Sequence, residues 1–206
     1  MIIAPLHKLI ILVFTWLNCC ATFLRYLLTV ATILFSSLGY TQTMAIGDEI
    51  PSVSVQHLGE IHLQQKQVVF SPWSSRALLG KVRIIQLVPG KADARTLNQH
   101  LIHAISRAEF DTTQYQTTTI INANDAFWGT EMFVKSSAMA LKKQYSWMMV
   151  IFDENGQVAQ RWHLTHHEQS TLVVDRKGKI KFIKRGRLDD HTINTLIHIT
   201  SDLIHH

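Results

Sequence analysis

The sequence predicts one α/β domain that follows an N-terminal export segment. Three observations support this prediction. Two apolar runs open the chain, and no acidic residue occurs before Asp48. Short β-branched runs then alternate with segments whose apolar residues recur at helical spacing. Of the 206 residues, about 160 remain after the first segment, which is a common size for a single domain.

Residues 1–45 have the composition of an export signal, with apolar runs at 9–17 and 26–38. The second run has about 13 residues, closer to a signal-peptide core than to a membrane span of about 20. Small residues follow it, including Gly39 and Ala45. We therefore expect cleavage near residues 39–45 and a domain from residue 46 to 206 in the periplasm. An uncleaved anchor, with the domain facing the periplasm, stays open as the alternative.

Both cysteines, Cys19 and Cys20, lie in the export segment. A cleaved protein would therefore be a cysteine-free domain. It could not use a disulfide framework, cysteine-ligated zinc or thiol redox chemistry, although export leads to a compartment where disulfides persist.

The expected mature part is mildly basic. It holds 18 Lys and Arg (20 less Lys8 and Arg25) against 15 Asp and Glu, a net charge of +3 (18 less 15). Much of the excess lies in residues 176–187, RKGKIKFIKRGR. A solvated strand whose lysines protect a sheet edge explains this segment better than nucleic-acid binding, so we expect no nucleic-acid partner.

The elements at the start of the domain are predicted from alternation and turn residues. Residues 52–57 and 60–63 alternate around Leu58-Gly59, which predicts a leading hairpin. Residues 70–75 predict a corner at which Ser74 or Ser75 caps a short helix. The nearly continuous apolar run 82–88 predicts a central strand buried on both faces.

Two helices and two strands are expected next. The first helix has its apolar stripe at Leu97, Leu101, Ile105 and Ala108, and the β-branched run 117–121 predicts a strand parallel to the first. The second helix has its stripe at Val134, Ala138, Leu141 and Tyr145, and residues 148–152 predict another strand.

Two Asp-x-x-Gly corners follow, at 153–156 and 175–178. Asp opens a turn through its side chain and Gly accepts positive φ. The second corner predicts a hairpin between 171–174 and 180–184, whereas the first fits either a hairpin or a turn into a short helix. A final helix is expected over 190–204, with Asp189 or Asp190 at its start.

This order of elements resembles a thioredoxin-like or peroxiredoxin-like domain, a three-layer α/β/α architecture with a central mixed sheet and here an N-terminal hairpin. Several segments also resemble, in the same order, the YtfJ family of small periplasmic proteins of unassigned function. These segments are 73–75 with 80–83, 115–122, 132–137 and 142–147. The resemblance runs from about residue 47 to the C-terminus.

The resemblance implies where chemistry would lie. Redox enzymes of this fold present a cysteine at the corner that here reads 89–93, PGKAD, and a cis-proline in the loop that here reads 166–170, HHEQS. We therefore expect neither thiol oxidoreductase nor peroxidase activity. If the two loops face each other, they form a small polar cleft at a helix N-terminus. Its residues would be Gly90, Lys91, Asp93, His166, His167 and Glu168.

A non-redox binding or interaction protein of the periplasm is the function we expect, with an unknown protein or a small polar ligand as partner. Contact with a membrane is expected only through an uncleaved N-terminal segment. The alternative is a metal-binding protein or enzyme that uses the His-rich loop from His163 to Glu168. That spacing matches no strong metal motif, so no metal or other cofactor is predicted. We expect Trp73, Trp128, Trp147 and Trp162 to pack in the core or at its rim.

Overall fold

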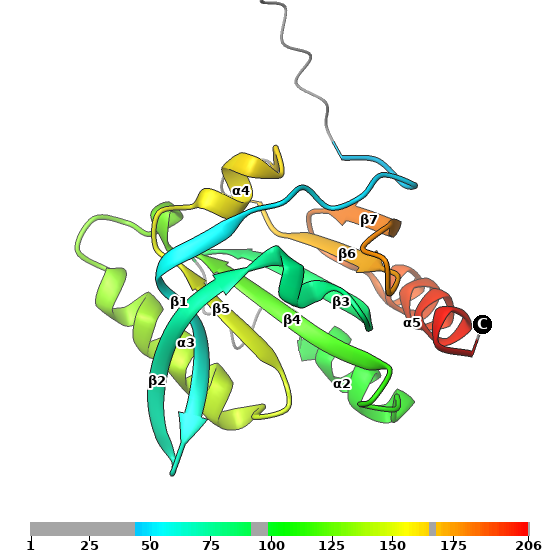
Figure 1. Cartoon of the computed structure of the whole chain (residues 1–206), viewed down its shortest axis with the longest axis horizontal. Coiled ribbons are helices and arrows are strands. Elements are labelled where there is room, and N and C mark those ends of the chain that lie inside the picture. Colours follow the sequence, from blue (N-terminus) through cyan, green and yellow to red (C-terminus); the bar gives the residue numbers. More distant parts are fainter. Residues whose placement is uncertain (1–43, 92–98, 165–167, 206) are drawn as a thin grey trace, which may run out of the picture. The chain divides into compact units, whose positions relative to one another are not determined.

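The computed structural model describes residues 44–91, 99–164 and 168–205. They form a seven-stranded mixed sheet in the order β2-β1-β5-β4-β3-β6-β7, with helices on both faces (Figure 1). This confirms the predicted α/β architecture. The elements along the chain are β1 (Ser54–Gln64), β2 (Gln67–Ser74), η1 (Ser75–Leu78), β3 (Val82–Pro89), α2 (Gln99–Ala108), β4 (Tyr115–Asn122), η2 (Ala123–Asp125), α3 (Glu131–Gln144), β5 (Met149–Asp153), α4 (Gln157–Arg161), β6 (Ser170–Val174), β7 (Ile180–Arg185) and α5 (Asp190–His205).

Three parallel strands form the centre of the sheet. β3 pairs with β4, and β4 pairs with β5, in parallel register. All residues of β3 and β5 are buried, as their nearly continuous apolar sequences predict. Strand β1 and the hairpin β6–β7 add antiparallel pairs on either side.

Apolar residues from successive β3 positions face two different layers. Ile85 and Leu87 belong to the core that packs against η1 and the short helix α4. Trp162, the residue that follows α4, is fully buried in the same core. Ile84 packs in the core with Leu101 of α2 and with residues of α5, and the neighbouring core includes residues of α3. The period of two along the strand therefore supplies both helical layers.

The leading hairpin exists, but its turn was predicted at the wrong place. β1 is one strand, and its hairpin with β2 turns at Gln65 and Lys66. Leu58 and Gly59 form a bulge inside β1, with φ of 61° and 73° and a shift of register against β2. A bulge resets the alternation of side chains, so one bulged strand has the sequence pattern of two short ones.

The corner predicted over residues 70–75 is also displaced. β2 continues to Ser74, and Pro72 is accommodated because β2 is an edge strand. Ser74 caps η1 as predicted, since its hydroxyl accepts a hydrogen bond from the Arg76 N–H at 3.4 Å.

The remaining described elements agree with their sequence patterns, whereas Leu97 of the first predicted helical stripe lies outside the described residues. The turn at Gly156 leads into helix α4, which decides between the two alternatives for that corner, and the second Asp-x-x-Gly corner joins β6 and β7. Asp189 caps α5 by accepting a hydrogen bond from Thr192 N–H at 2.7 Å. β7 lies at the edge of the sheet, as expected for the basic segment, and Lys181 pairs there with Asp175 at 3.3 Å. Among the described residues, no helix is both long and apolar enough to span a membrane.

Candidate functional site

The corner after β3 is shaped by a close approach of two backbones. Gly90 N–H donates a hydrogen bond to the Asn122 carbonyl at the end of β4, at 2.8 Å. A Cβ on Gly90 would lie 2.8 Å from that same oxygen and 3.2 Å from Ala123 Cα. Gly90 is not among the glycines with positive φ. Glycine is therefore needed here for lack of space rather than for an unusual backbone conformation.

Polar side chains follow the carboxyl ends of β4 and β5. The Asn122 amide donates to Asp125 Oδ2 at 2.9 Å, and both residues are buried. The Asp153 carboxylate accepts hydrogen bonds from Gln157 N–H at 3.0 Å and Val158 N–H at 2.8 Å. It thereby caps the start of α4.

Burial raises the pKa of Asp153 above its ordinary value, although the backbone N–H groups of α4 act in the opposite direction. Asp153 is completely buried, so its ionised form carries a charge that water cannot solvate, and burial disfavours that form. From the sequence, Asp153 was predicted only as a turn residue, and Asn122 and Asp125 were not predicted as site residues. The available signal was a polar residue at the carboxyl end of each of two apolar parallel strands.

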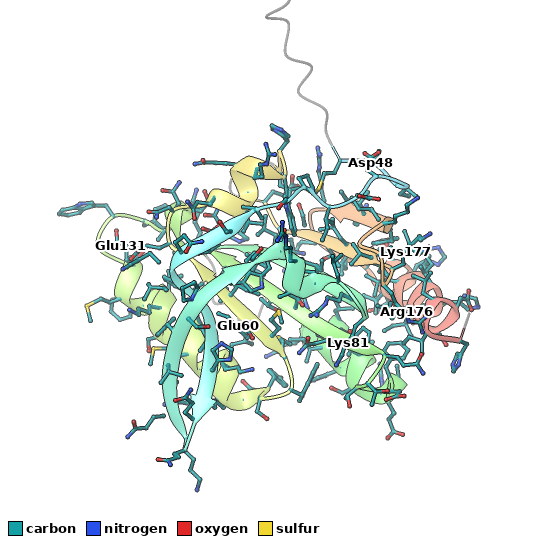
Figure 2. All side chains as sticks on the ribbon, viewed as in Figure 1. Asp48, Glu60, Lys81, Glu131, Arg176 and Lys177 are labelled. Atoms are coloured by element: carbon teal, nitrogen blue, oxygen red, sulfur yellow. The ribbon has the colours of Figure 1, made fainter. Side chains whose placement is uncertain are left out.

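An exposed apolar segment lies beside this corner. Phe127, Trp128, Met132 and Phe133 are 62%, 97%, 84% and 76% exposed, and we call residues 127–133 the apolar segment. The Lys91 ammonium lies 5.2 Å from the centre of the Phe127 ring, a cation–π contact that joins the corner to this segment. Glu131 projects from the same segment (Figure 2). Scattered exposed apolar residues are ordinary, but a contiguous group of this size indicates a contact surface.

The expectation that all four tryptophans pack in or beside the core is wrong for Trp128. Trp73 and Trp162 are buried, and Trp147 is 40% exposed. Trp128 lies in a turn with Gly129, before α3 begins, where no core stripe continues. The aromatic and apolar residues of 127–133 are of the types usually found in a core. Their exposure was therefore not predicted from the sequence.

The structure describes only part of the predicted polar cleft. Gly90, Lys91 and Glu168 are described, whereas Asp93, His166 and His167 lie outside the described residues. Leu87 of β3 pairs with Ser170 of β6, so the end of β3 and the chain just before β6 lie at the same edge of the sheet.

The side chains of the described cleft residues point to different neighbours. Lys91 contacts Phe127, whereas a Cβ on Gly186 would lie 3.1 Å from Glu168 Oε1. Neither Lys91 nor Glu168 forms an ion pair with another described residue.

The His-rich loop is represented in the structure by His163, Leu164 and Glu168. His163 is exposed, with a φ of 50°. Within the described part of the chain, no three His, Cys, Asp or Glu residues are grouped closely enough to hold a metal ion. The metal-binding alternative depends on His166 and His167, which lie outside that part.

The mixed sheet and its helices have the fold of the thioredoxin-like and peroxiredoxin-like class. Mycobacterium tuberculosis AhpC shares the fold with a TM-score of 0.55 and 18% identity, over 78% of this chain and 96% of that one. The thioredoxin domain of a thiol-disulfide oxidoreductase from Bacteroides vulgatus has a TM-score of 0.51 and 14% identity, over 77% and 99% of the two chains. Likeness at these identities shows the fold alone.

Within this class, the chain belongs to the YtfJ family, as its motifs predict. Residues 44–203 match the family described as bacterial protein of unknown function (YtfJ_HI0045). An uncharacterised protein of Haemophilus influenzae is 39% identical over 179 residues, which cover 87% of this chain and 97% of that protein. The uncharacterised protein YtfJ of Escherichia coli is 32% identical over 181 residues, covering 88% and 98%.

The description "cysteine-free" applies to the matched domain and not to the whole chain. Residues 44–206 contain no cysteine, whereas Cys19 and Cys20 precede them, outside the described residues.

Proposed function

We propose that this protein is exported to the periplasm, loses its N-terminal segment, and acts there as a non-redox interaction protein. The observation that carries the proposal is the apolar segment beside the β3 corner. Its Phe127, Trp128, Met132 and Phe133 are exposed, and Phe127 contacts Lys91 of the corner at which a redox enzyme of this fold would present its cysteine.

The partner we propose is a protein that inserts an apolar side chain among these four residues. Aromatic residues and methionine are enriched in the buried centres of protein interfaces, where few contacts supply most of the affinity. Lys91 and Glu131 supply a polar rim of both charges. A membrane surface fits less well, because anionic lipid would repel the Glu131 carboxylate, which lies between Trp128 and Met132 in the segment.

The non-redox part of the proposal rests on the residues at the corner. Thiol–disulfide exchange and peroxide reduction both require a thiolate as the attacking atom. Residues 89–91 read Pro-Gly-Lys, and the matched domain has no cysteine. The exported protein is expected to leave insulin disulfides and hydrogen peroxide unreduced. Turnover by protein that lacks Cys19 and Cys20 would contradict this.

Photo-crosslinking in the producing cells tests the interaction. A benzoylphenylalanine at position 133 is expected to give a discrete adduct with one protein that mass spectrometry can identify. The double substitution Trp128→Ser/Met132→Ser should lower the yield at least about five-fold, which corresponds to about 1 kcal/mol. Ile46→Ser/Leu79→Ser is the matched control, since Ile46 and Leu79 are also exposed and lie outside the apolar segment.

Two results would overturn the proposed contact surface. A yield at position 133 no greater than that at position 79 would show that the segment has no specific partner. Adducts with lipid in place of protein would make the segment a membrane contact.

N-terminal sequencing of the protein recovered from the periplasm tests export and cleavage separately. We expect a mature end between residues 39 and 46. A mature end before Arg25, or recovery of the full chain in the membrane fraction, would contradict the proposed cleavage and would support a membrane anchor instead.

A further inference from the structure

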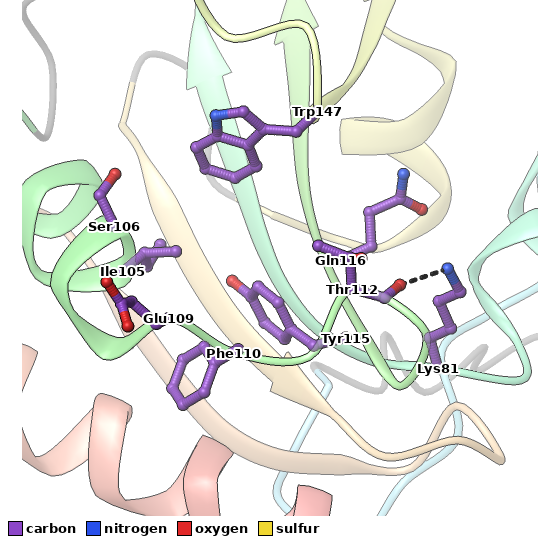
Figure 3. Close-up of a pocket in the computed structure, with 9 residues that line it drawn as sticks. All are labelled: Lys81, Ile105, Ser106, Glu109, Phe110, Thr112, Tyr115, Gln116 and Trp147. Atoms are coloured by element: carbon purple, nitrogen blue, oxygen red, sulfur yellow. Dashed lines mark hydrogen bonds between the residues drawn. The ribbon is translucent and has the colours of Figure 1, made fainter.

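A hollow lies at the end of the parallel strands opposite the apolar segment, where β4 begins. It has a volume of about 560 Å³, within the range of small-molecule sites, and is open to solvent on one side. Its walls come from the end of α2, the start of β4, the loop before β5 and the residue before β3 (Figure 3). None of these residues belongs to the apolar segment or to the β3 corner.

One half of the hollow is aromatic and apolar. Phe110 and Tyr115 pack at 4.9 Å between ring centres, in the same core cluster as the buried Ile105 of α2. Trp147 faces them from the loop before β5 (Figure 3). The Tyr145 ring packs edge-on against Trp147, with 6.0 Å between ring centres. Because Trp147 is 40% exposed, its indole ring is available to a ligand. These side chains form a fixed apolar surface suited to a flat ring.

The other half presents hydrogen-bond donors. The Arg83 guanidinium donates a hydrogen bond to Gln116 Oε1 at 2.6 Å. This bond fixes the orientation of the Gln116 amide, whose NH₂ group can then donate hydrogen bonds to a ligand. Lys81 Nζ donates one proton to the Thr112 carbonyl at 2.7 Å, and an ammonium carries two more (Figure 3). Lys81 forms no ion pair with another described residue, although Asp111 acts on it electrostatically.

Glu109 provides the only carboxylate that lines the described hollow, across from Lys81 (Figure 3). The Glu109 carboxylate repels an anionic ligand group from the α2 side of the hollow. Such a group is therefore favoured on the opposite side, near Lys81 and Gln116. Burial raises the pKa of the Tyr115 hydroxyl, which bonds to Thr117 Oγ1 at 2.7 Å, so the phenol adds no charge. The two halves therefore differ in both polarity and charge.

We propose that this hollow binds a small aromatic monocarboxylate, with its ring against Trp147 and its carboxylate toward Gln116 and Lys81. The apolar surface recognises the ring, the donors recognise the carboxylate, and Glu109 disfavours a second anionic group at the ring's far end. This site is independent of the proposed protein interaction, because the two use no common residue.

The test is an NMR titration of ¹⁵N-labelled protein, purified from a producing bacterium, with naphthalene-2-carboxylate. Naphthalene-2-carboxamide is the matched neutral probe of the same shape. We expect saturable shifts of amides in residues 105–116 and at 147, with a carboxylate dissociation constant on the order of 1 mM or below. The carboxamide should bind about five-fold more weakly.

Three variants divide the recognition into its parts. Trp147→Ala should weaken both probes about ten-fold. Lys81→Met should weaken the carboxylate about five-fold and leave the carboxamide unchanged, an effect that a loss of folding would not produce. Trp128→Ala, in the apolar segment, should change neither constant.

The proposal fails if the two probes bind equally and Lys81→Met changes neither. It also fails if the shifts are not saturable, or if they map to residues 127–133. A result of that last kind would leave the proposed protein interaction intact, so the two proposals can fail separately.

Discussion

The two ends of the parallel strands use apolar side chains in opposite ways. At the carboxyl end, Phe127, Trp128 and Phe133 project outward beside a corner that is closed by a backbone contact at Gly90. At the amino end, Phe110, Tyr115 and Trp147 turn toward one another around a hollow.

The buried charges at the two ends also differ. Arg83, 3% exposed, extends toward the amino end, and its guanidinium donates to Ala77 O, Leu78 O, Gln116 Oε1 and Thr118 Oγ1. Burial lowers its pKa to about 10, an effect that Glu60 partly offsets. At the carboxyl end the buried Asp153 carboxylate accepts hydrogen bonds from backbone N–H groups of one helix, and the buried Asp125 accepts one from the nearby Asn122 amide. One end is thus supported by a network that joins several elements, and the other by local caps.

Removing the arginine network should give the largest effect. Arg83→Met leaves four oxygen acceptors without their donor, and we expect the free energy of unfolding to fall by about 3 kcal/mol or more. Urea denaturation measures this. The exposed Arg76 of η1 provides the control, since Arg76→Met should stay within about 0.5 kcal/mol. A loss below about 1 kcal/mol for Arg83→Met would remove the contrast between the two ends.

Closing the space at the β3 corner should give the next largest effect. Gly90→Ala forces a methyl group against the Asn122 carbonyl and the Ala123 backbone, which should cost about 1–3 kcal/mol. Gly129 has open space but a φ of 79°, so Gly129→Asn adds backbone strain without a steric clash and should cost about 1 kcal/mol. Equal losses in thermal unfolding would show that the corner is not constrained by packing.

The contribution of Asp153 to the free energy of unfolding should change with pH in a direction that its pKa shift predicts. Because the folded-state pKa of Asp153 is raised, its protonated form favours folding, and this contribution is lost as the pH rises through that pKa. The unfolding free energy of the wild type relative to Asp153→Asn should therefore decrease from about pH 4 toward pH 7. An increase over this range would mean that the N–H groups of α4 outweigh burial.

Asp111, at the amino end, is the control for that titration. Its pKa is lowered, chiefly by the backbone N–H and hydroxyl of Thr113. Because the folded-state pKa of Asp111 is lowered, its contribution to stability is complete above about pH 5 and is lost as the pH falls below that value. The difference between wild type and Asp111→Asn should therefore stay constant between about pH 5 and pH 7.

Substitutions in the apolar segment should have the smallest effect on stability. Trp128→Ser and Phe133→Ser remove side chains that are 97% and 76% exposed, so the free energy of unfolding should change by less than about 0.5 kcal/mol. The buried Trp162 is the contrasting tryptophan, and Trp162→Ser should cost about 3 kcal/mol or more. A large loss for Trp128→Ser would make the segment a folding element and would remove the reason for a partner.

Local patterns in the sequence determined most of the fold. The apolar run of β3, the helical stripes of α2 and α3, and the Asp-x-x-Gly corners each contain their signal within a few residues. A helix or strand that buries one face has apolar residues at the period of its own backbone. This pattern can therefore be recognised without knowing which element packs against that face. The bulge at Leu58-Gly59 was misinterpreted because the alternation alone does not show that a strand continues through an extra residue.

Tertiary structure alone decided which surfaces are available. Gly90 is required by the approach of Asn122 and Ala123, which lie more than 30 positions later in the chain. Trp73 and Trp128 are chemically identical, but one is buried in the core and the other projects from a turn. The amino-end hollow joins three stretches of chain, at Lys81, at residues 105–116 and at Trp147. Exposure and enclosure depend on which distant segments pack together, and no short stretch of sequence contains that information.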